Sequence, residues 1–204
     1  MRTRTASLML LCAVALLGFP ALSSADTVSL LGDKDCFGLG GSCADGSRYV
    51  ADLGGVYFQN NQQAGDPSFT DYWDTPGSVS YTHTYGVPSG ATAATLEVKI
   101  AGIHDINTAD TYSVLFDGTQ VGIIPVNSDL SAFEEVLTYD FNIPLSLLTG
   151  TDTVSWSGTS GDGYSIDYSQ LTVTTAAVPE PTTLLLLGSG LVGLAGLGWR
   201  RNRQ

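Results

Sequence analysis

Aspartates gather at two points of the chain where their carboxylates could hold a cation. One group lies in a glycine-rich stretch near the start, and the other lies before and within the last apolar run. The residues are Asp33, Asp35 and Asp45, and Asp162 and Asp167. Acids that alternate with other residues in such loops supply the oxygen ligands that Ca²⁺ prefers, although neither group has the twelve-residue EF-hand pattern. The pattern therefore predicts a calcium site. The alternative is that Asp33 and Asp45 cap turns and that Asp167, which alternates with Ile166 and Tyr168, simply faces water.

Two cysteines, Cys36 and Cys43, enclose six residues that include three glycines. In an oxidising compartment this spacing favours a local disulfide. A zinc site is the weaker alternative, because zinc needs four ligands and neither His83 nor His104 stands at a matching spacing. We therefore expect a disulfide between Cys36 and Cys43.

Aromatic side chains form a third group of candidates. Tyr72 and Trp73 lie in a long polar stretch, residues 60–77, where an exposed ring could stack on a sugar. The alternative is that they anchor the loop by packing beneath it. Trp156 alternates with other apolar residues and is expected in the core.

Signs of catalysis are few. The sequence has no Gly-x-Ser-x-Gly elbow, no metalloprotease motif and no phosphate-binding loop. His104 and Asp105 are adjacent, and adjacent side chains on a strand point to opposite faces. A glycan hydrolase with two carboxylates remains the alternative, because many acids are available. We expect no enzymatic activity.

The charge of the central part of the chain is strongly one-sided. Residues 26–177 contain three basic side chains, Lys34, Arg48 and Lys99, against nineteen acidic ones, a formal net charge of −16. Binding to nucleic acid needs a basic surface, so this composition excludes a nucleic-acid partner. About 150 residues are enough for one domain with its own core.

Apolar and polar residues alternate with a period of two along most of this domain, the pattern of half-buried strands. Asp117-Gly118 predicts a tight hairpin, Pro144 to Thr149 a helical turn, and a change of phase near Ser169 a bulge. The predicted strands are 28–31, 48–53, 56–59, 79–85, 96–100, 112–116, 121–124, 137–143, 153–157 and 164–174. Because no long amphipathic helix interrupts them, the fold class is predicted to be all-β, a β-sandwich.

Three motifs give this domain a resemblance to the β-jelly-roll modules of secreted bacterial proteins. They are Leu-x-Val-x-Ile at 96–100, Tyr-x-Val-x-Phe-Asp-Gly at 112–118 and Gly-Asp-Gly-Tyr-Ser-Ile-Asp-Tyr at 161–168. Many such modules bind carbohydrate, so the resemblance implies polysaccharide as a partner. A structural calcium often ties the start of such a module to its final strand, which would bring the two aspartate groups together.

The N-terminus has the three parts of a secretory signal peptide. Arg2 and Arg4 precede an apolar run at 8–19, and small residues follow it. We place cleavage between Ala25 and Asp26, and an uncleaved anchor helix is the alternative. The chain is therefore expected to meet the secretion machinery and to leave the cytoplasm.

The C-terminus carries an uncharged run of 18 residues, Thr182 to Trp199, followed by three arginines. As a helix this run would span about 27 Å, enough for a thin hydrocarbon core. Trp199 suits the membrane interface, and Arg200, Arg201 and Arg203 should keep the end in the cytoplasm. The run therefore predicts a single transmembrane helix at about 182–199, and a buried core helix is the alternative.

Pro179-Glu180-Pro181 precedes this run, and the whole tail resembles the PEP-CTERM sorting signal of Gram-negative bacteria. The resemblance implies recognition by the membrane transpeptidase exosortase, with the tail as a temporary anchor in the inner membrane. The final location implied is the envelope surface or the extracellular matrix.

The predicted organisation is thus a signal peptide (1–25), a jelly-roll-like β-sandwich (26–177) and a sorting and anchor segment (178–204). The expected function is that of a non-catalytic protein of the cell surface or exopolysaccharide. A carbohydrate-binding module stabilised by calcium is the alternative.

Overall fold

The computed structural model describes residues 22–23, 26–57, 59–73, 78–102, 111–125, 134–157, 164–176, 178–179 and 188–190. Contacts between residues divide the chain into two compact units. One is Asp26–Thr175, and the other combines the terminal segments Met1–Ala25 and Ala176–Gln204.

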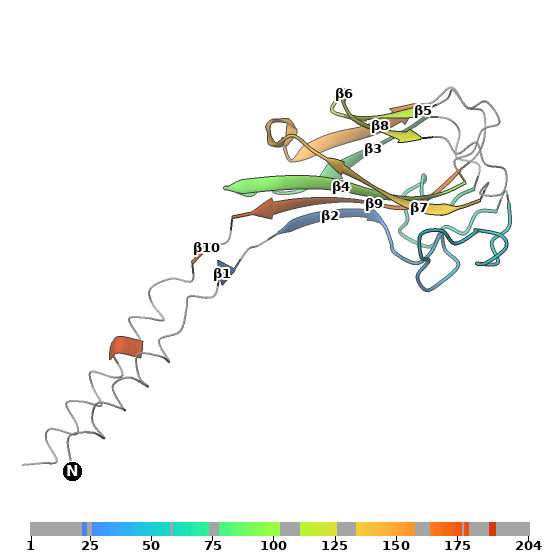
Figure 1. Ribbon diagram of the computed structural model, residues 1–204, viewed down its shortest axis with the longest axis horizontal. Coiled ribbons are helices and arrows are strands. Elements are labelled where there is room, and N and C mark those ends of the chain that lie inside the picture. The colour runs from blue at the N-terminus through green and yellow to red at the C-terminus, as the bar shows by residue number, and fades with distance from the viewer. Residues whose placement is uncertain are drawn as a thin grey trace, which may run out of the picture. The chain divides into compact units, whose positions relative to one another are not determined.

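Asp26–Thr175 contains two four-stranded antiparallel sheets (Figure 1). The first sheet has the order β2-β9-β4-β7, with bounds Thr27–Gly32, Ser165–Thr175, Ala91–Ala101 and Val136–Asn142. The second sheet has the order β3-β8-β5-β6, with bounds Ser78–Thr84, Thr151–Ser157, Thr111–Phe116 and Thr119–Pro125. This strand order is that of a jelly roll, so the predicted fold class, an all-β sandwich, is confirmed.

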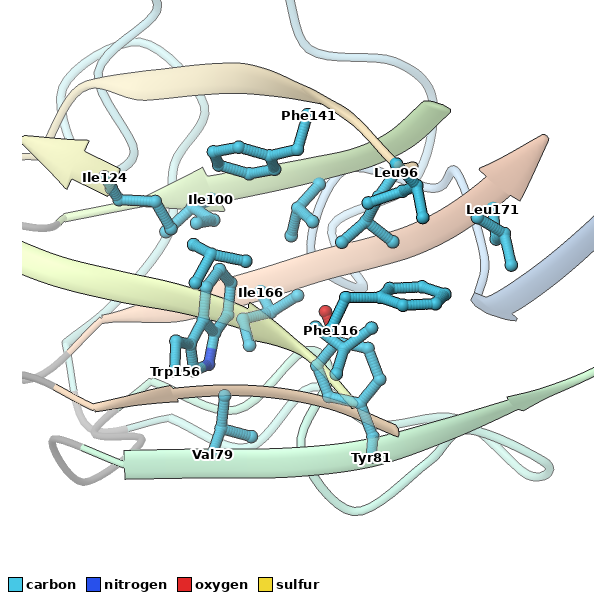
Figure 2. Close-up of a cluster of buried hydrophobic side chains, with 14 of the residues drawn as sticks. Val79, Tyr81, Leu96, Ile100, Phe116, Ile124, Phe141, Trp156, Ile166 and Leu171 are labelled. Atoms are coloured by element: carbon cyan, nitrogen blue, oxygen red, sulfur yellow. The ribbon is translucent and has the colours of Figure 1, made fainter. Parts of the chain in front are cut away.

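Period-two sequences build the core between the sheets. In β3 every second residue is buried, so Val79 and Tyr81 point inward while the serines and threonines beside them face water. Figure 2 shows these two side chains with Trp156 meeting side chains of the first sheet such as Leu96 and Ile166. Trp156 is therefore a core residue, as the sequence predicts. Burial of this apolar surface is the main stabilising contribution.

Two local predictions are confirmed. Asp117 and Gly118 connect β5 to β6 with φ angles of 47° and 75°, the left-handed backbone that a type I′ hairpin requires. Leu145–Leu147 forms a 3₁₀ turn inside the predicted helical segment. Both features depend on neighbouring residues alone, which explains why their sequence signals are reliable.

The predicted bulge in the last strand lies two residues earlier than expected. Tyr168 pairs with Lys99, whereas Ile166 pairs with Ile100, so Asp167 is the extra residue. Asp167 is only 2% exposed, because its carboxylate lies against the loop after β2 and accepts the Phe37 N–H. The alternative that this carboxylate simply faces water is therefore wrong.

Two predicted strands, 48–53 and 56–59, are absent from the described residues. The segment 48–55 folds into consecutive turns, in which Asp52 N donates to Arg48 O at 2.9 Å and Gly55 N donates to Tyr49 O at 2.9 Å. The Glu134 carboxylate accepts the Val50 N–H and forms an ion pair with Arg48 at 3.2 Å. These contacts, together with the isolated bridge between Arg48 and Glu135, satisfy backbone groups of the segment without making it a strand of either sheet.

A buried histidine links the two sheets. His83 of β3 lies between two serines of the first sheet, with Nδ1 3.1 Å from Ser29 Oγ and Nε2 3.0 Å from Ser169 Oγ. Its side chain is fully buried, and burial lowers the pKa of His83 to about 4. The imidazole is therefore neutral at pH 7.

In the terminal unit, β1 (Leu22–Ser23) pairs with β10 (Val178–Pro179) in antiparallel register, and residues 188–190 are helical. The described parts of the chain include no helix that is long and apolar enough to cross a membrane. Most of the predicted span at 182–199 and nearly all of the predicted signal peptide lie outside the described residues. So do Ala25, Glu180, Pro181 and the three arginines.

Candidate metal centre

The loop after β2 is fixed by a disulfide and a small hydrophobic cluster. Cys36 and Cys43 are bonded with a Cα–Cα distance of 5.3 Å, which confirms the predicted pair. Both belong to the second core cluster of the domain, whose buried members also include Phe37, Tyr49 and Trp73. This cluster packs the early loops into one body.

Removing this disulfide is expected to destabilise the loop. The two cysteines are seven positions apart, so the loop-entropy model gives about 2.5 kcal/mol. We expect the double change of Cys36 and Cys43 to serine to lower the free energy of unfolding by that amount in urea titrations. Ser42→Ala, inside the same loop, is the control and should have little effect. Equal stability of the oxidised protein and the double variant would contradict the prediction.

Three aspartates meet at this end of the domain. Asp33 and Asp35 follow β2, and Asp71 comes from the loop that precedes β3. One carboxylate oxygen from each lies within 4.8 Å of the others. The loops thus bring together acids 36 residues apart in the chain.

Asp71 is the least expected member. Its side chain is 1% exposed, and neither carboxylate oxygen has a hydrogen-bond partner. Its backbone is engaged, because Asp71 N donates to Ile166 O at 2.8 Å and Asp71 O accepts from Asn61 N at 2.9 Å. A buried carboxylate without partners is costly, so an opposite charge at this position would stabilise its ionised form.

A fourth carboxylate, Asp167, lies close enough to affect the others. Its Oδ1 accepts the Phe37 N–H at 2.6 Å. Burial, followed by the negative charges of Asp35 and Asp167, raises the pKa of Asp71 to about 8. Burial also raises the pKa of Asp167 to about 6, and burial together with Asp35 raises the pKa of Asp33. These shifts come first from burial, and repulsion between the neighbouring carboxylates adds to it.

The backbone around the cluster is tightly turned. Cys36 and Phe37 have φ angles of 67° and 58°, and Asp71 has 57°, all in the left-handed region that non-glycine residues rarely adopt. The turn aims the Gly38 N–H at Asp35 Oδ1, 2.8 Å away. A Cβ at Gly32 would come within 2.6 Å of Asp167 O, so this close approach needs glycine.

The donor set fits a hard divalent cation. All the candidate ligand atoms are carboxylate oxygens, which suit Ca²⁺ or Mg²⁺ rather than the thiolate and imidazole sites of zinc. The unpartnered oxygens of Asp71 and the buried Asp33 Oδ1 are the observation that carries this fit. A cation here would neutralise the repulsion and tie two loops together.

The structure distributes the predicted ligands differently from the sequence analysis. Asp33 and Asp35 meet as expected, and Asp167 lies beside them. Asp45 is a correction, because its carboxylate forms an ion pair with Lys99 at 2.9 Å and accepts hydrogen bonds from Thr138. Asp162 lies outside the described residues. Asp71 was missed, although it directly precedes the aromatic pair at 72–73.

Of the two aromatic residues predicted to contact a sugar, Tyr72 and Trp73, one is buried and the other is exposed. Trp73 is 3% exposed and packs against Tyr49 and Tyr57 at ring-centroid distances of 4.8 and 5.1 Å. Gly102 lies against its ring, since a Cβ there would reach within 2.2 Å of it. Trp73 is therefore a loop anchor rather than a platform. Tyr72 is 37% exposed, and its predicted glycan contact stays a prediction.

Residues 177–203 match the family model described as the PEP-CTERM protein-sorting motif. This motif directs export to the cell envelope or surface and implies processing by exosortase. No protein in the curated set matches the chain.

Solved structures that are similar to this chain include a β-porphyranase of glycoside hydrolase family 86 from Bacteroides plebeius. It is 19% identical with a TM-score of 0.40, and the match covers 54% of this chain but only 20% of the porphyranase. A family 35 carbohydrate-binding module from an environmental isolate is 20% identical, with 67% and 92% of the two chains covered and a TM-score of 0.38. The family 35 module of Cellvibrio japonicus Abf62 is 16% identical, with 74% and 99% covered and a TM-score of 0.32.

Proposed function

We propose that this chain is a non-catalytic protein of the cell surface or the exopolysaccharide matrix, whose folded domain is stabilised by calcium. The sorting motif at 177–203 is the observation that carries the proposal. It follows the folded unit Asp26–Thr175 almost directly, so the domain is the part that export delivers. Two sandwiched sheets with a disulfide-bonded loop suit a protein that works outside the cell.

The buried polar side chains support a structural role. His83 bridges the sheets, Glu134 holds the turns around Val50, and Asp152 accepts hydrogen bonds from Tyr85 and Thr149. Each of these groups stabilises packing and lies below the surface. A glycan hydrolase remains the third candidate, and reproducible turnover of a polysaccharide, lost on one Asp→Asn change, would replace our proposal.

Calcium is the cofactor that we propose for the acidic cluster. Asp33, Asp35 and Asp71 would supply its ligands, with Asp167 beside them. The ion would act as a cross-link and not as a reagent. It would join the loop after β2 to the loop before β3, and its charge would stabilise the ionised form of the buried Asp71.

Removal of the sorting motif's charge tests the proposed route. We expect Glu180→Gln to leave the full-length chain in the membrane fraction, because the change alters the motif that exosortase is proposed to recognise. Immunoblots of membrane, surface and medium fractions would measure the distribution. Glu135→Gln, which removes the same charge from the folded domain, is the matched control and should be exported normally.

Intact-mass measurement of the surface protein gives a second readout. The mature chain is expected to begin at Asp26 and to lack Arg200 to Gln204. Surface protein that keeps these arginines would mean a permanent anchor, and the temporary-anchor proposal would fail.

Polysaccharide binding is the second candidate function. The observation that favours it is the serine- and threonine-rich outer surface of the second sheet.

A further inference from the structure

The outer surface of the second sheet is lined by hydroxyl groups. Its outward positions on the three neighbouring strands β3, β8 and β5 are almost all serine or threonine. The residues, which we call the hydroxyl face, are Ser78, Ser80, Thr82, Thr84, Thr111, Ser113, Thr151, Thr153 and Ser155. All of them are exposed or half-buried.

Strand pairing places these side chains in rows. Ser80 pairs with Ser155, Thr82 with Thr153, and Thr84 with Thr151. The Thr82 and Thr153 hydroxyls are 3.4 Å apart. Rows of this kind repeat about every 7 Å along the strands, and neighbouring strands are about 4.8 Å apart. The face is thus a regular array of groups that both donate and accept hydrogen bonds.

The hydroxyl face has an apolar border. Leu115 pairs with Ser155 on β8, and Ile123 of β6 pairs with Ser113. Ile123 is 48% exposed, although it is a large hydrophobic residue in an otherwise polar surface. Sugar rings combine hydroxyl edges with C–H surfaces, so they suit a surface that offers both kinds of contact.

Charge is absent from the outward positions of these four strands. Their acid and histidine, Asp152 and His83, point inward and are buried. The outer side of the first sheet is different, because it carries Glu97, Lys99 and Asp140. A domain with a formal net charge of −16 therefore leaves the outward strand positions of this described sheet uncharged. The exposed Asp117 lies at the end of the face, in the β5–β6 turn, where its carboxylate accepts the Thr153 N–H at 2.7 Å.

We propose that the hydroxyl face binds an uncharged polysaccharide chain laid across β3, β8 and β5. This inference rests on the proposed location in the exopolysaccharide matrix and adds the contact surface and the class of partner. The negative field of the domain repels an acidic polymer, and it equally repels a second copy of this chain. A neutral polymer is not repelled by this field, and its hydroxyl groups can form hydrogen bonds with those of the hydroxyl face.

Affinity for a single chain should be modest. Each neutral hydrogen bond adds little net free energy in water, and the face has no aromatic ring on which a sugar could stack. Strong attachment would therefore come from many copies of the protein on one polymer.

Affinity electrophoresis tests the proposal on the full chain in a polyoxyethylene detergent, which carries no sugar. Native gels would contain dextran, mixed-linkage β-glucan or galactomannan, with dextran sulfate as the charged counterpart of dextran. We expect retardation by at least one neutral polymer and none by dextran sulfate. No retardation by any of the three neutral polymers, or equal retardation by dextran sulfate, would overturn the proposal.

Variants locate the contact. Thr82→Lys places a charge at the centre of the hydroxyl face and should weaken retardation at least tenfold. Asn142→Lys, at an exposed outward position of the edge strand β7 in the first sheet, is the matched control and should bind normally. Equal binding by both variants would mean that the polymer binds elsewhere. Thermal melts would show that both variants fold.

Sedimentation of the same samples tests whether a second copy of the chain, and not a polysaccharide, covers the hydroxyl face. A dimer that Thr82→Lys dissociates would assign the face to a second copy and overturn the proposal. These results do not depend on sorting, so loss of binding with normal export would leave the proposed location intact. Failed export would instead remove the proposed function.

Discussion

Calcium at 10 mM is expected to raise the midpoint of thermal unfolding by about 5–10 °C over the same protein in EDTA. A site with a dissociation constant of about 0.1 mM, within the range of extracellular calcium modules, would be in hundredfold excess. That excess corresponds to about 2.7 kcal/mol of linkage free energy, and a domain of this size shifts by about 2–4 °C per kcal/mol. Differential scanning calorimetry would measure the shift. An unchanged midpoint would remove calcium from the proposed function.

The variant Asp71→Asn tests whether calcium stabilises the domain by binding at the acidic cluster or through a general effect of salt. Without calcium the variant should be more stable than the wild type at pH 7.5, because it removes a buried carboxylate that lacks partners. The gain should be at least about 1.4 kcal/mol, the equivalent of one pKa unit. With calcium the variant should show no shift. Asp52→Asn, an exposed acid outside the cluster, is the control and should respond to calcium as the wild type does.

Acid is expected to weaken the domain through His83. The folded pKa of about 4 lies below the ordinary value of 6.5, so the unfolded chain binds a proton that the folded chain excludes. The contribution of the neutral, buried His83 to the free energy of unfolding is fully present above pH 6.5. It is lost as the pH falls toward 4. Between pH 7 and pH 4.5 this one group should cost about 2.5 kcal/mol.

The comparison variant for this effect is His83→Gln, because carboxylates elsewhere also titrate in acid. Urea titrations at pH 7 and pH 4.5 would give the difference in stability between the two proteins. That difference should shrink by about 2.5 kcal/mol at the lower pH. A difference that stays constant would show that His83 does not bind a proton on unfolding. Proton NMR of the imidazole offers a direct check of its pKa.

The fold could be predicted largely because its signals are local. Alternation reveals which face of β3 is buried, and Asp117-Gly118 specifies a hairpin from two residues. The prediction of a strand at 48–53 is wrong, because the backbone of this segment forms hydrogen bonds within its own turns and with Glu134. Glu134 is more than 80 positions away, so no local pattern could announce it.

The candidate metal centre was harder to predict for a related reason. The aspartates after β2 are visible as a pair, but Asp71 joins them only through the path of a long loop. The burial of Asp167 depends on the loop after β2, whose Phe37 N–H donates to the Asp167 carboxylate from 130 positions away in the chain. The sequence shows that carboxylates are available as ligands, but contacts between distant parts of the chain decide which of them come together.

The order of strands in the first sheet has a consequence for how the chain folds as it is exported. β9 lies between β2 and β4, so the last long strand to emerge is also the one that joins the first strand to the rest. If translocation runs from the N-terminus, the sheet stays incomplete until Thr175 has crossed, and the sorting motif begins two residues later. Completion of the domain and arrival of the tail are therefore nearly simultaneous events. The first sheet would therefore lack β9, and stay open, until the tail reaches the membrane and can halt export.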